Sequence, residues 1–253
     1  MADSVSNPVL TALRAKVQAL EGQSGRVRDV LPFGVAGIDR QLPGGGLALG
    51  ALHEVAGGGA DAVHGSVAAL FAAGIAARVN GKVLWCVTQR DLFAPALEQA
   101  GLVPDRVIFI EAGDEKSLLS CFEEGLRHGS LGAVVAEIAR LPMTISRRLQ
   151  LAAERSGTIG IALRRWRHPS GEADFGQPTA AVTRWRTYFV PSAPLPVAGI
   201  GRARWRLELV RCRGGEAAEF EVEACDAQGH IAFPSKLVDR PAATKIARRF
   251  AAS

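Results

Sequence analysis

Residues 50–78 constrain the fold of this chain more than any other stretch. Residues 52–56 are predicted to form a short strand, and a run of small apolar residues at 67–78 predicts a helix. The turn between them holds four glycines and a serine, namely Gly57, Gly58, Gly59, Gly65 and Ser66. A strand, a glycine-rich turn and a helix form the layout of a phosphate-binding loop, in which backbone N–H groups and the helix N-terminus hold a polyphosphate.

The residues that carry out phosphate chemistry are missing from this turn. A phosphate-binding loop reads G-x-x-x-x-G-K-[ST], where the Lys contacts the phosphates and the hydroxyl contacts Mg²⁺. Here Gly59 and Gly65 are six positions apart, and no Lys or Arg lies between Arg40 and Arg78. Two interpretations stay open. Either a nucleotide fold has lost its nucleotide, or the glycines serve only a strand-to-helix turn, with Ser66 as the residue that caps the helix.

Composition places the chain among globular proteins. It has 253 residues, of which 48% are hydrophobic and 22% charged, and a formal net charge of +5. No run approaches the roughly 18–20 apolar residues that span a membrane, and the N-terminus lacks the pattern of a secretion signal, so we expect a cytoplasmic protein. The cysteines are scattered without C-x-x-C spacing, which disfavours a zinc site and a disulfide framework. Cys86 lies in an apolar run and is expected to be buried.

Predicted strands and helices alternate through the middle of the chain. Strands are expected at residues 82–87, 107–110, 133–138 and 158–163, and helices at 94–100, 114–127 and 146–156. This alternation predicts an α/β fold with a doubly wound, mostly parallel sheet and helices on both faces. Ligands of such sheets bind beyond the carboxyl ends of the strands. Later alternating patterns predict antiparallel strands near the C-terminus, at residues 181–190, 202–212 and 219–225.

The chain divides into three predicted parts. Residues 1–30 form an N-terminal helix and linker, residues 31–235 form the core domain, and residues 236–253 form a basic tail. The helix, expected at residues 8–21, either packs on its own domain or acts as an arm that docks on a partner, because isolated helices of this length need tertiary contacts to persist.

Three Arg-Trp-Arg triplets, centred on Trp166, Trp185 and Trp205, are the most unusual motif of the C-terminal half. Arginine with interleaved aromatic residues suits single-stranded DNA, through phosphate contacts and base stacking. Neighbours in a strand point to opposite faces, so Trp185 and Trp205 are expected in the core and their arginines in solvent. The candidate residues for binding nucleic acid or a protein partner are Arg165, Arg167, Phe175, Arg184, Arg186, Arg204 and Arg206.

The order of these motifs resembles the core of RecA-type recombinases. Residues 175–179 resemble the start of the second DNA-binding loop of RecA, and residues 183–186 and 204–215 resemble the ImuA family of RecA-related bacterial proteins. The resemblance covers residues 31–235. It implies a role in the SOS response to DNA damage, in translesion synthesis with ImuB, a catalytically inactive relative of Y-family polymerases, and an error-prone DNA polymerase. It also makes RecA a candidate partner.

The chain differs from RecA at positions where RecA has charged residues that act in catalysis. Gln89 stands where RecA keeps its catalytic Glu, and Glu137 is the only acid near the Walker B position. Phosphoryl transfer depends on such charges, so the resemblance implies an accessory or adaptor protein without enzymatic activity or cofactor. The alternative is a divergent DNA-dependent ATPase, which alone would use ATP and Mg²⁺. Glu137 would then hold Mg²⁺; otherwise we expect it to pair with Arg140 or Arg164.

Two histidines, His53 and His64, flank the glycine-rich turn. A zinc site would need further ligands at suitable spacing, and the sequence shows none. We therefore expect both histidines to be solvated or hydrogen-bonded, and we assign no metal site.

Overall fold

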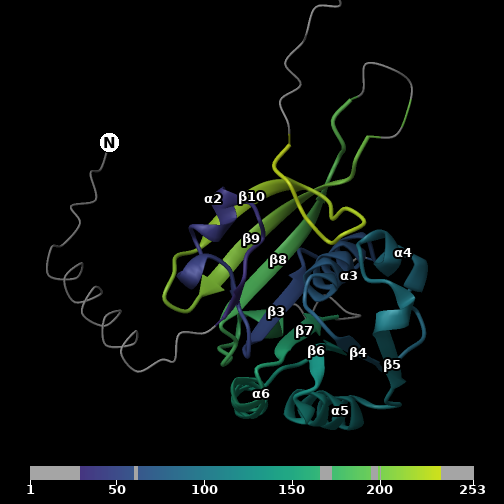
Figure 1. The fold of residues 1–253 in the computed structure, drawn as a ribbon, viewed down its shortest axis with the longest axis vertical. Helices are drawn as coiled ribbons and strands as arrows, with labels where there is room; N and C mark the ends of the chain where they lie inside the picture. The colour runs from purple at the N-terminus through teal and green to yellow at the C-terminus, as the bar shows by residue number, and fades with distance from the viewer. Residues whose placement is uncertain (1–28, 60–61, 166–172, 195–198, 200, 235–253) are drawn as a thin grey trace, which may run out of the picture.

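The structure, a computed structural model, describes residues 29–59, 62–165, 173–194, 199 and 201–234 (Figure 1). The helix expected at residues 8–21 and the basic tail at 236–253 lie outside the described residues. The division of the chain into three parts therefore stays a prediction.

An eight-stranded sheet forms the centre of the fold, in the order β10-β9-β8-β3-β7-β6-β4-β5. Its strands are β3 (Leu52–Gly57), β4 (Lys82–Val87), β5 (Val107–Glu111), β6 (Leu131–Ile138), β7 (Ile159–Arg164), β8 (Thr183–Val190), β9 (Arg204–Cys212) and β10 (Ala218–Glu223). The six strands from β8 to β5 run parallel, and β9 and β10 are antiparallel. The predicted α/β fold with antiparallel C-terminal strands is confirmed.

Helices cover both faces of the sheet (Figure 1). The helices are α2 (Ala36–Asp39), α3 (Ala62–Ala77), α4 (Ala94–Gln99), α5 (Glu115–His128) and α6 (Met143–Ser156). On one face α3 packs against β3 and β8, with α4 beside it, and on the other α5 and α6 pack against each other and the parallel strands. None of the helices in the described part of the chain is long and apolar enough to cross a membrane.

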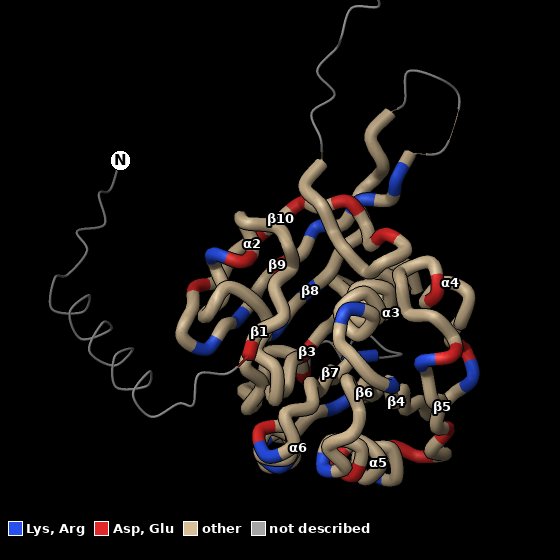
Figure 2. The backbone as a smooth tube through the Cα atoms, in the orientation of Figure 1, with Lys and Arg blue, Asp and Glu red and all other residues tan. Residues whose placement is uncertain are grey.

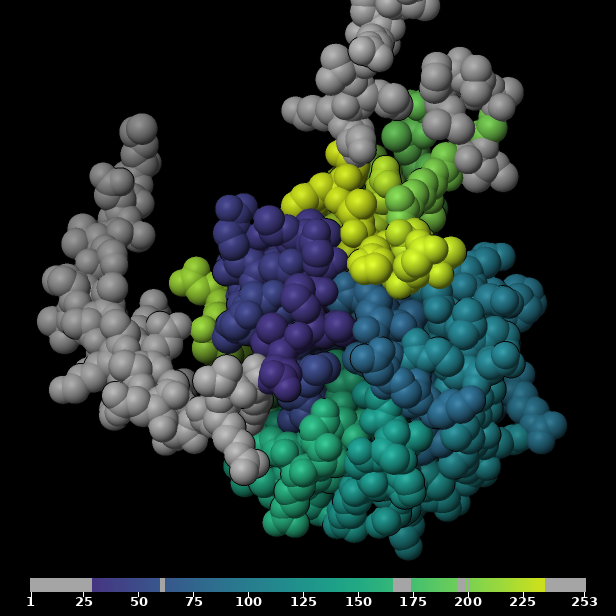
Figure 3. All heavy atoms as spheres, viewed as in Figure 1, coloured from purple at the N-terminus to yellow at the C-terminus, as the bar shows by residue number. Residues whose placement is uncertain are grey.

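Short elements complete the fold. A two-stranded sheet joins β1 (Val30–Leu31) to β2 (Leu47–Ala48), and 3₁₀ turns occupy η1 (Pro43–Gly45), η2 (Pro104–Arg106) and η3 (Ala173–Gly176). The N-terminal part of the core, purple in Figure 3, lies beside the yellow segment that follows β10. A Cβ added at Gly37 would lie 2.8 Å from the ring of Phe233, so this contact leaves no room for a side chain. The two ends of the core domain are thus packed together.

Local sequence determines where helix α5 begins and ends. The Asp114 carboxylate accepts a hydrogen bond from the backbone N–H of Ser117 at 2.9 Å and caps the first turn. Gly129, with φ of 74°, ends the helix in the left-handed conformation that glycine adopts without strain. The predicted apolar positions Leu118 and Phe122 are fully buried against the sheet. Helix and sheet therefore share one apolar layer.

Two hydrophobic cores lie on opposite faces of the sheet. The core under α3 contains Trp185 and Trp205, so the prediction that both are core residues is confirmed. The core under α5 and α6 contains Cys86, as predicted. Burial raises the pKa of the Cys86 thiol to about 12. The four cysteines all stay unpaired as free thiols.

The main difference from the sequence prediction lies at the start of α3. The helix begins at Ala62, five residues before the predicted start, so Gly65 and Ser66 are helical. The hydroxyl of Ser66 donates to the carbonyl of Ala62 at 2.7 Å, so the prediction that Ser66 caps the helix is wrong. Nothing in residues 62–64 opposes helix, and one glycine inside a helix is tolerated.

Candidate functional site

The glycine-rich turn at the carboxyl end of β3 is shorter than the sequence predicts. The strand ends at Gly57 and α3 begins at Ala62, so only residues 58–61 connect them. A phosphate-binding loop keeps its glycines in the turn and its K-[ST] pair at the helix N-terminus. Here Gly65 and Ser66 lie one turn inside the helix, away from the exposed N–H groups that begin it.

Close packing explains Gly57, which ends β3, and Gly58, which follows it. A Cβ on Gly57 would lie 2.7 Å from the carbonyl carbon of His64, and one on Gly58 would lie 1.9 Å from the ring of Tyr188. The backbone N–H of Gly58 donates to the carbonyl of Thr187 at 2.8 Å, so it extends the sheet instead of facing a ligand. This geometry favours the interpretation in which the glycines serve the strand-to-helix turn.

The tyrosine beside the turn is held from several sides. Its ring packs edge-to-face on His64, with the ring centres 5.7 Å apart, and the Arg206 guanidinium lies 4.1 Å from its centre. The Tyr188 hydroxyl donates to Glu208 at 3.2 Å. Because these contacts fix the ring, it cannot move easily away from Gly58.

We expect the Gly58→Ala substitution to destabilise the protein by about 1–3 kcal/mol, because the new methyl group overlaps the Tyr188 ring. In a Tyr188→Ala background the same substitution should cost much less, since the obstructing ring is gone. Urea unfolding of the four proteins in this double-mutant cycle measures the coupling. Additive effects would contradict close packing as the reason for glycine at this position.

The carboxylate of Glu137 lies at the carboxyl end of β6 and is engaged on both oxygens. Trp85 Nε1 donates to Oε1 at 2.9 Å, and Arg165 Nη1 donates to Oε2 at 2.5 Å. Arg165 also holds Asp91 through two hydrogen bonds of 3.0 and 3.1 Å. Burial alone would lower the pKa of Arg165, but the charges of Glu137 and Asp91 outweigh it, so this pKa is raised.

The prediction that Glu137 pairs with Arg140 or Arg164 is therefore wrong, since its partner is Arg165. Neighbouring residues at a strand end point to opposite faces, so Arg164 and Arg165 serve different sites. The backbone N–H of Arg165 donates to the carbonyl of Ile138 at 2.9 Å, which places its side chain beside Glu137. No group of three or more side chains arranged to hold a metal ion occurs among the described residues.

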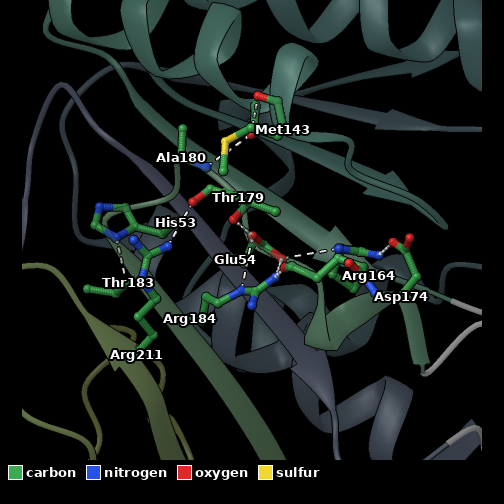
Figure 4. Close-up of polar contacts among 12 residues, drawn as sticks. His53, Glu54, Met143, Arg164, Asp174, Thr179, Ala180, Thr183, Arg184 and Arg211 are labelled. Atoms are coloured by element: carbon green, nitrogen blue, oxygen red, sulfur yellow. Dashed lines mark hydrogen bonds and ion pairs between the residues drawn. The ribbon is translucent and has the colours of Figure 1, made fainter.

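A second buried carboxylate, Glu54 on β3, organises the neighbouring strands (Figure 4). Arg164 Nη1 donates to it at 3.1 Å, Arg184 Nε donates at 3.3 Å, and the Thr179 hydroxyl donates as well. Arg164 also donates to the carboxylate of Asp174. The side chains of Glu54 and Arg164 are fully buried. The network thus ties β3, β7 and β8 to the segment that follows η3.

Phe175 lies under this network and is only 1% exposed. The guanidinium groups of Arg184, Arg186 and Arg164 lie 4.9, 5.2 and 5.9 Å from the centre of its ring. The structure therefore corrects two expectations, because neither Phe175 nor Arg184 is exposed to solvent. The physical reason is Glu54, a charge on the central strand that attracts the arginines inward.

Two further arginines of the triplets, Arg204 and Arg206, lie on β9. Arg204 pairs with Glu221, and Arg206 Nε lies 3.8 Å from Glu219, so each faces an acidic residue of β10. Figure 2 shows basic and acidic positions interspersed along these strands. Arg165, directly after β7, pairs with Glu137 and Asp91.

 Between Arg164 and Arg213 the sequence holds ten arginines and three acidic residues. This local count misses the acids that other strands supply, such as Glu137, Glu219 and Glu221. Arg167 lies outside the described residues.

Of the two histidines near the turn, His53 is hydrogen-bonded, as expected. His53 is buried, with Nδ1 2.7 Å from the Thr183 hydroxyl and Nε2 2.9 Å from the carbonyl of Ala48. His64 packs on Tyr188. Neither contact involves a metal ligand set.

Sequence reasoning missed Glu54 and its partners Asp174 and Thr179. One signal was available, because Glu54 is an acidic residue in a predicted strand that also holds Leu52, Val55 and Ala56. Such a residue is rarely buried unless it is paired, so it predicts a buried partner. The identity of that partner depends on which strands lie beside β3, and this is a property of the fold.

The comparison with solved structures identifies the fold. The crystal structure of the RadB recombinase superimposes with a TM-score of 0.54 and covers 79% of this chain and 98% of its own, at 19% sequence identity. At this identity the match shows the fold alone, which is RecA-like.

The comparison with curated proteins identifies the family. The chain is 40% identical over 236 residues to Protein ImuA of Caulobacter vibrioides, in strain NA1000 / CB15N and in strain ATCC 19089 / CIP 103742 / CB 15. Each alignment covers 87% of this chain and 96% of the relative. No family model matches the sequence. The chain belongs to the ImuA family.

Proposed function

We propose that this chain is a non-catalytic accessory protein of SOS-induced, error-prone translesion DNA synthesis. It acts as an adaptor for ImuB and an error-prone DNA polymerase, in the cytoplasm. Membership of the ImuA family and the RecA-like fold support this assignment.

One observation carries the non-catalytic part of the proposal, namely the state of the turn after β3. No Lys or Arg lies between Arg40 and Arg78 to neutralise a triphosphate. The N–H of Gly58 is used by Thr187, and both oxygens of Glu137 are used by Trp85 and Arg165. The Gly58 N–H and the Glu137 carboxylate, which could otherwise bind phosphate and a metal ion, are thus engaged within the protein.

An assay of phosphate release from ATP directly tests the proposal that the chain is not catalytic. The purified chain, incubated with ATP and Mg²⁺ with and without single-stranded DNA, should release no phosphate above the buffer background, because the turn after β3 has no lysine or arginine to position the triphosphate. A RecA-type recombinase serves as the positive control. DNA-dependent release that the Glu137→Gln substitution abolishes would replace the adaptor proposal with the alternative, a divergent ATPase.

The partner part of the proposal needs separate experiments. A pull-down of purified ImuB by the full chain tests the adaptor role, and RecA in the same assay tests the other candidate protein partner. Fluorescence anisotropy with labelled single-stranded DNA at low salt tests whether the triplet arginines contact DNA. Absence of ImuB binding would contradict the proposed function.

A further inference from the structure

The two edges of the central sheet differ in chemistry. The edge strand β10 follows the usual protective pattern, since Glu219, Glu221 and Glu223 alternate along it. Each of these acids pairs with an arginine, Arg206, Arg204 and Arg202 respectively. An incoming apolar strand would have to desolvate these charges, so this edge resists strand addition.

The opposite edge, β5, has no such protection. It pairs only with β4 in the described sheet and lies at its margin (Figure 1). Its first four residues, Val107, Ile108, Phe109 and Ile110, carry no charge, proline or glycine. The outward backbone groups of a strand at this position form a ready template for pairing with another chain.

Side chains on both faces of β5 remain exposed. Ile108 and Phe109 are each 46% exposed, whereas their neighbours on β4, Leu84 and Trp85, are buried. Successive strand residues point to opposite faces, so apolar surface flanks the open backbone on each side. The crossover from β4 to β5 adds Phe93, which is 68% exposed. An exposed apolar edge of this kind is uncommon in a protein that acts alone.

Charges are confined to the two ends of β5. At its carboxyl end Glu111 pairs with Arg90. At its amino end the Arg106 side chain donates to backbone carbonyls at the end of α3, including that of Ala77 at 2.6 Å. The partner segment that fits between these ends is therefore extended, about four to five residues long, and uncharged in its middle.

We propose that the β5 edge binds an extended apolar segment of a partner protein, which adds to the sheet as a ninth strand beside β5. Main-chain hydrogen bonds would supply affinity, and contacts with Ile108 and Phe109 would supply specificity. A second copy of this chain fits less well. Five edge residues bury far less than the roughly 800 Å² per partner of a stable interface, whereas an extended segment can continue along the crossover.

The inference rests on the proposed function for the identity of the partner, which is ImuB. Hydrogen exchange of the full chain, alone and with ImuB, should show at least about tenfold slower exchange of amides within residues 107–111 in the complex. The Ile108→Lys and Phe109→Lys substitutions should each weaken ImuB binding by about tenfold or more, because a charge would be buried in an apolar interface.

A matched control separates this surface from any exposed apolar residue. Leu151 on α6 is 52% exposed, and the Leu151→Lys substitution should leave ImuB binding unchanged. Circular dichroism of each variant checks that the fold is kept. Sedimentation of the chain without ImuB tests self-association through the same edge.

The outcomes are distinguishable. If the unmodified chain does not bind ImuB, the proposed function fails and the inference fails with it. If ImuB binds but residues 107–111 stay unprotected and the lysine variants bind normally, only the inference fails. A dimer of the chain that Ile108→Lys dissociates, with ImuB binding unaffected, would assign the edge to a second copy and overturn the proposal.

Discussion

Replacing Glu54 by glutamine should lower the free energy of unfolding by about 3–5 kcal/mol, the usual cost of removing one partner from a buried ion pair. The carboxylate is the shared acceptor of Arg164 and Arg184, whose side chains are 0% and 6% exposed. The neutral amide removes the shared counter-charge of both guanidinium groups, while the pair of Arg164 with Asp174 stays in place. Urea unfolding followed by circular dichroism measures the loss.

The same substitution should also loosen residues 173–179, which Glu54 holds through Thr179 and Arg184. Limited proteolysis should then cleave this segment faster in the variant. The matched control is Glu221→Gln, which also removes a carboxylate from an arginine partner on a strand but in a partly exposed pair, and should cost less than about 1 kcal/mol. Equal costs for the two variants would show that the buried network does not stabilise the fold.

Local sequence predicted the order of strands and helices because each element is amphipathic or apolar by itself. The apolar runs at residues 83–87 and 133–136 are typical of strands covered on both faces, and both belong to strands that lie inside the sheet. The predicted start of α3 was wrong, because glycines in a sequence favour the prediction of a turn even where the neighbouring residues can continue a helix. A boundary depends on what the helix packs against.

The candidate site was predicted less well, and the reason is the topology of the sheet. The sequence places Phe175, Arg184 and Arg186 in a basic, aromatic stretch that suits DNA. It does not show that β3 lies between β7 and β8, which places Glu54 among their arginines. Charge counted along the chain therefore overstates the basic surface, since the acids that balance it come from distant elements.

Substitution of Trp185 is the second change for which we expect a large loss of stability. Its result distinguishes a tryptophan that packs in the core from one that stacks on nucleic acid bases. The Trp185→Ala substitution should cost about 3–5 kcal/mol, as for other large aromatic residues removed from a core. The ring packs on Phe33 and Phe71 with centres 5.7 Å apart, and Nε1 donates to the Thr183 hydroxyl at 2.9 Å. Urea unfolding followed by far-ultraviolet circular dichroism measures the loss without relying on tryptophan fluorescence.

The control lies four residues along the same strand. Phe189 is 47% exposed, and the Phe189→Ala substitution should cost less than about 1 kcal/mol, because little buried area is lost. If Trp185 instead stacked on nucleic acid bases, Trp185→Ala would keep its stability and lose affinity for single-stranded DNA. A stable variant with weakened DNA binding would thus contradict the core role, whereas an unstable one follows from a ring that stabilises the interface between α3 and the sheet.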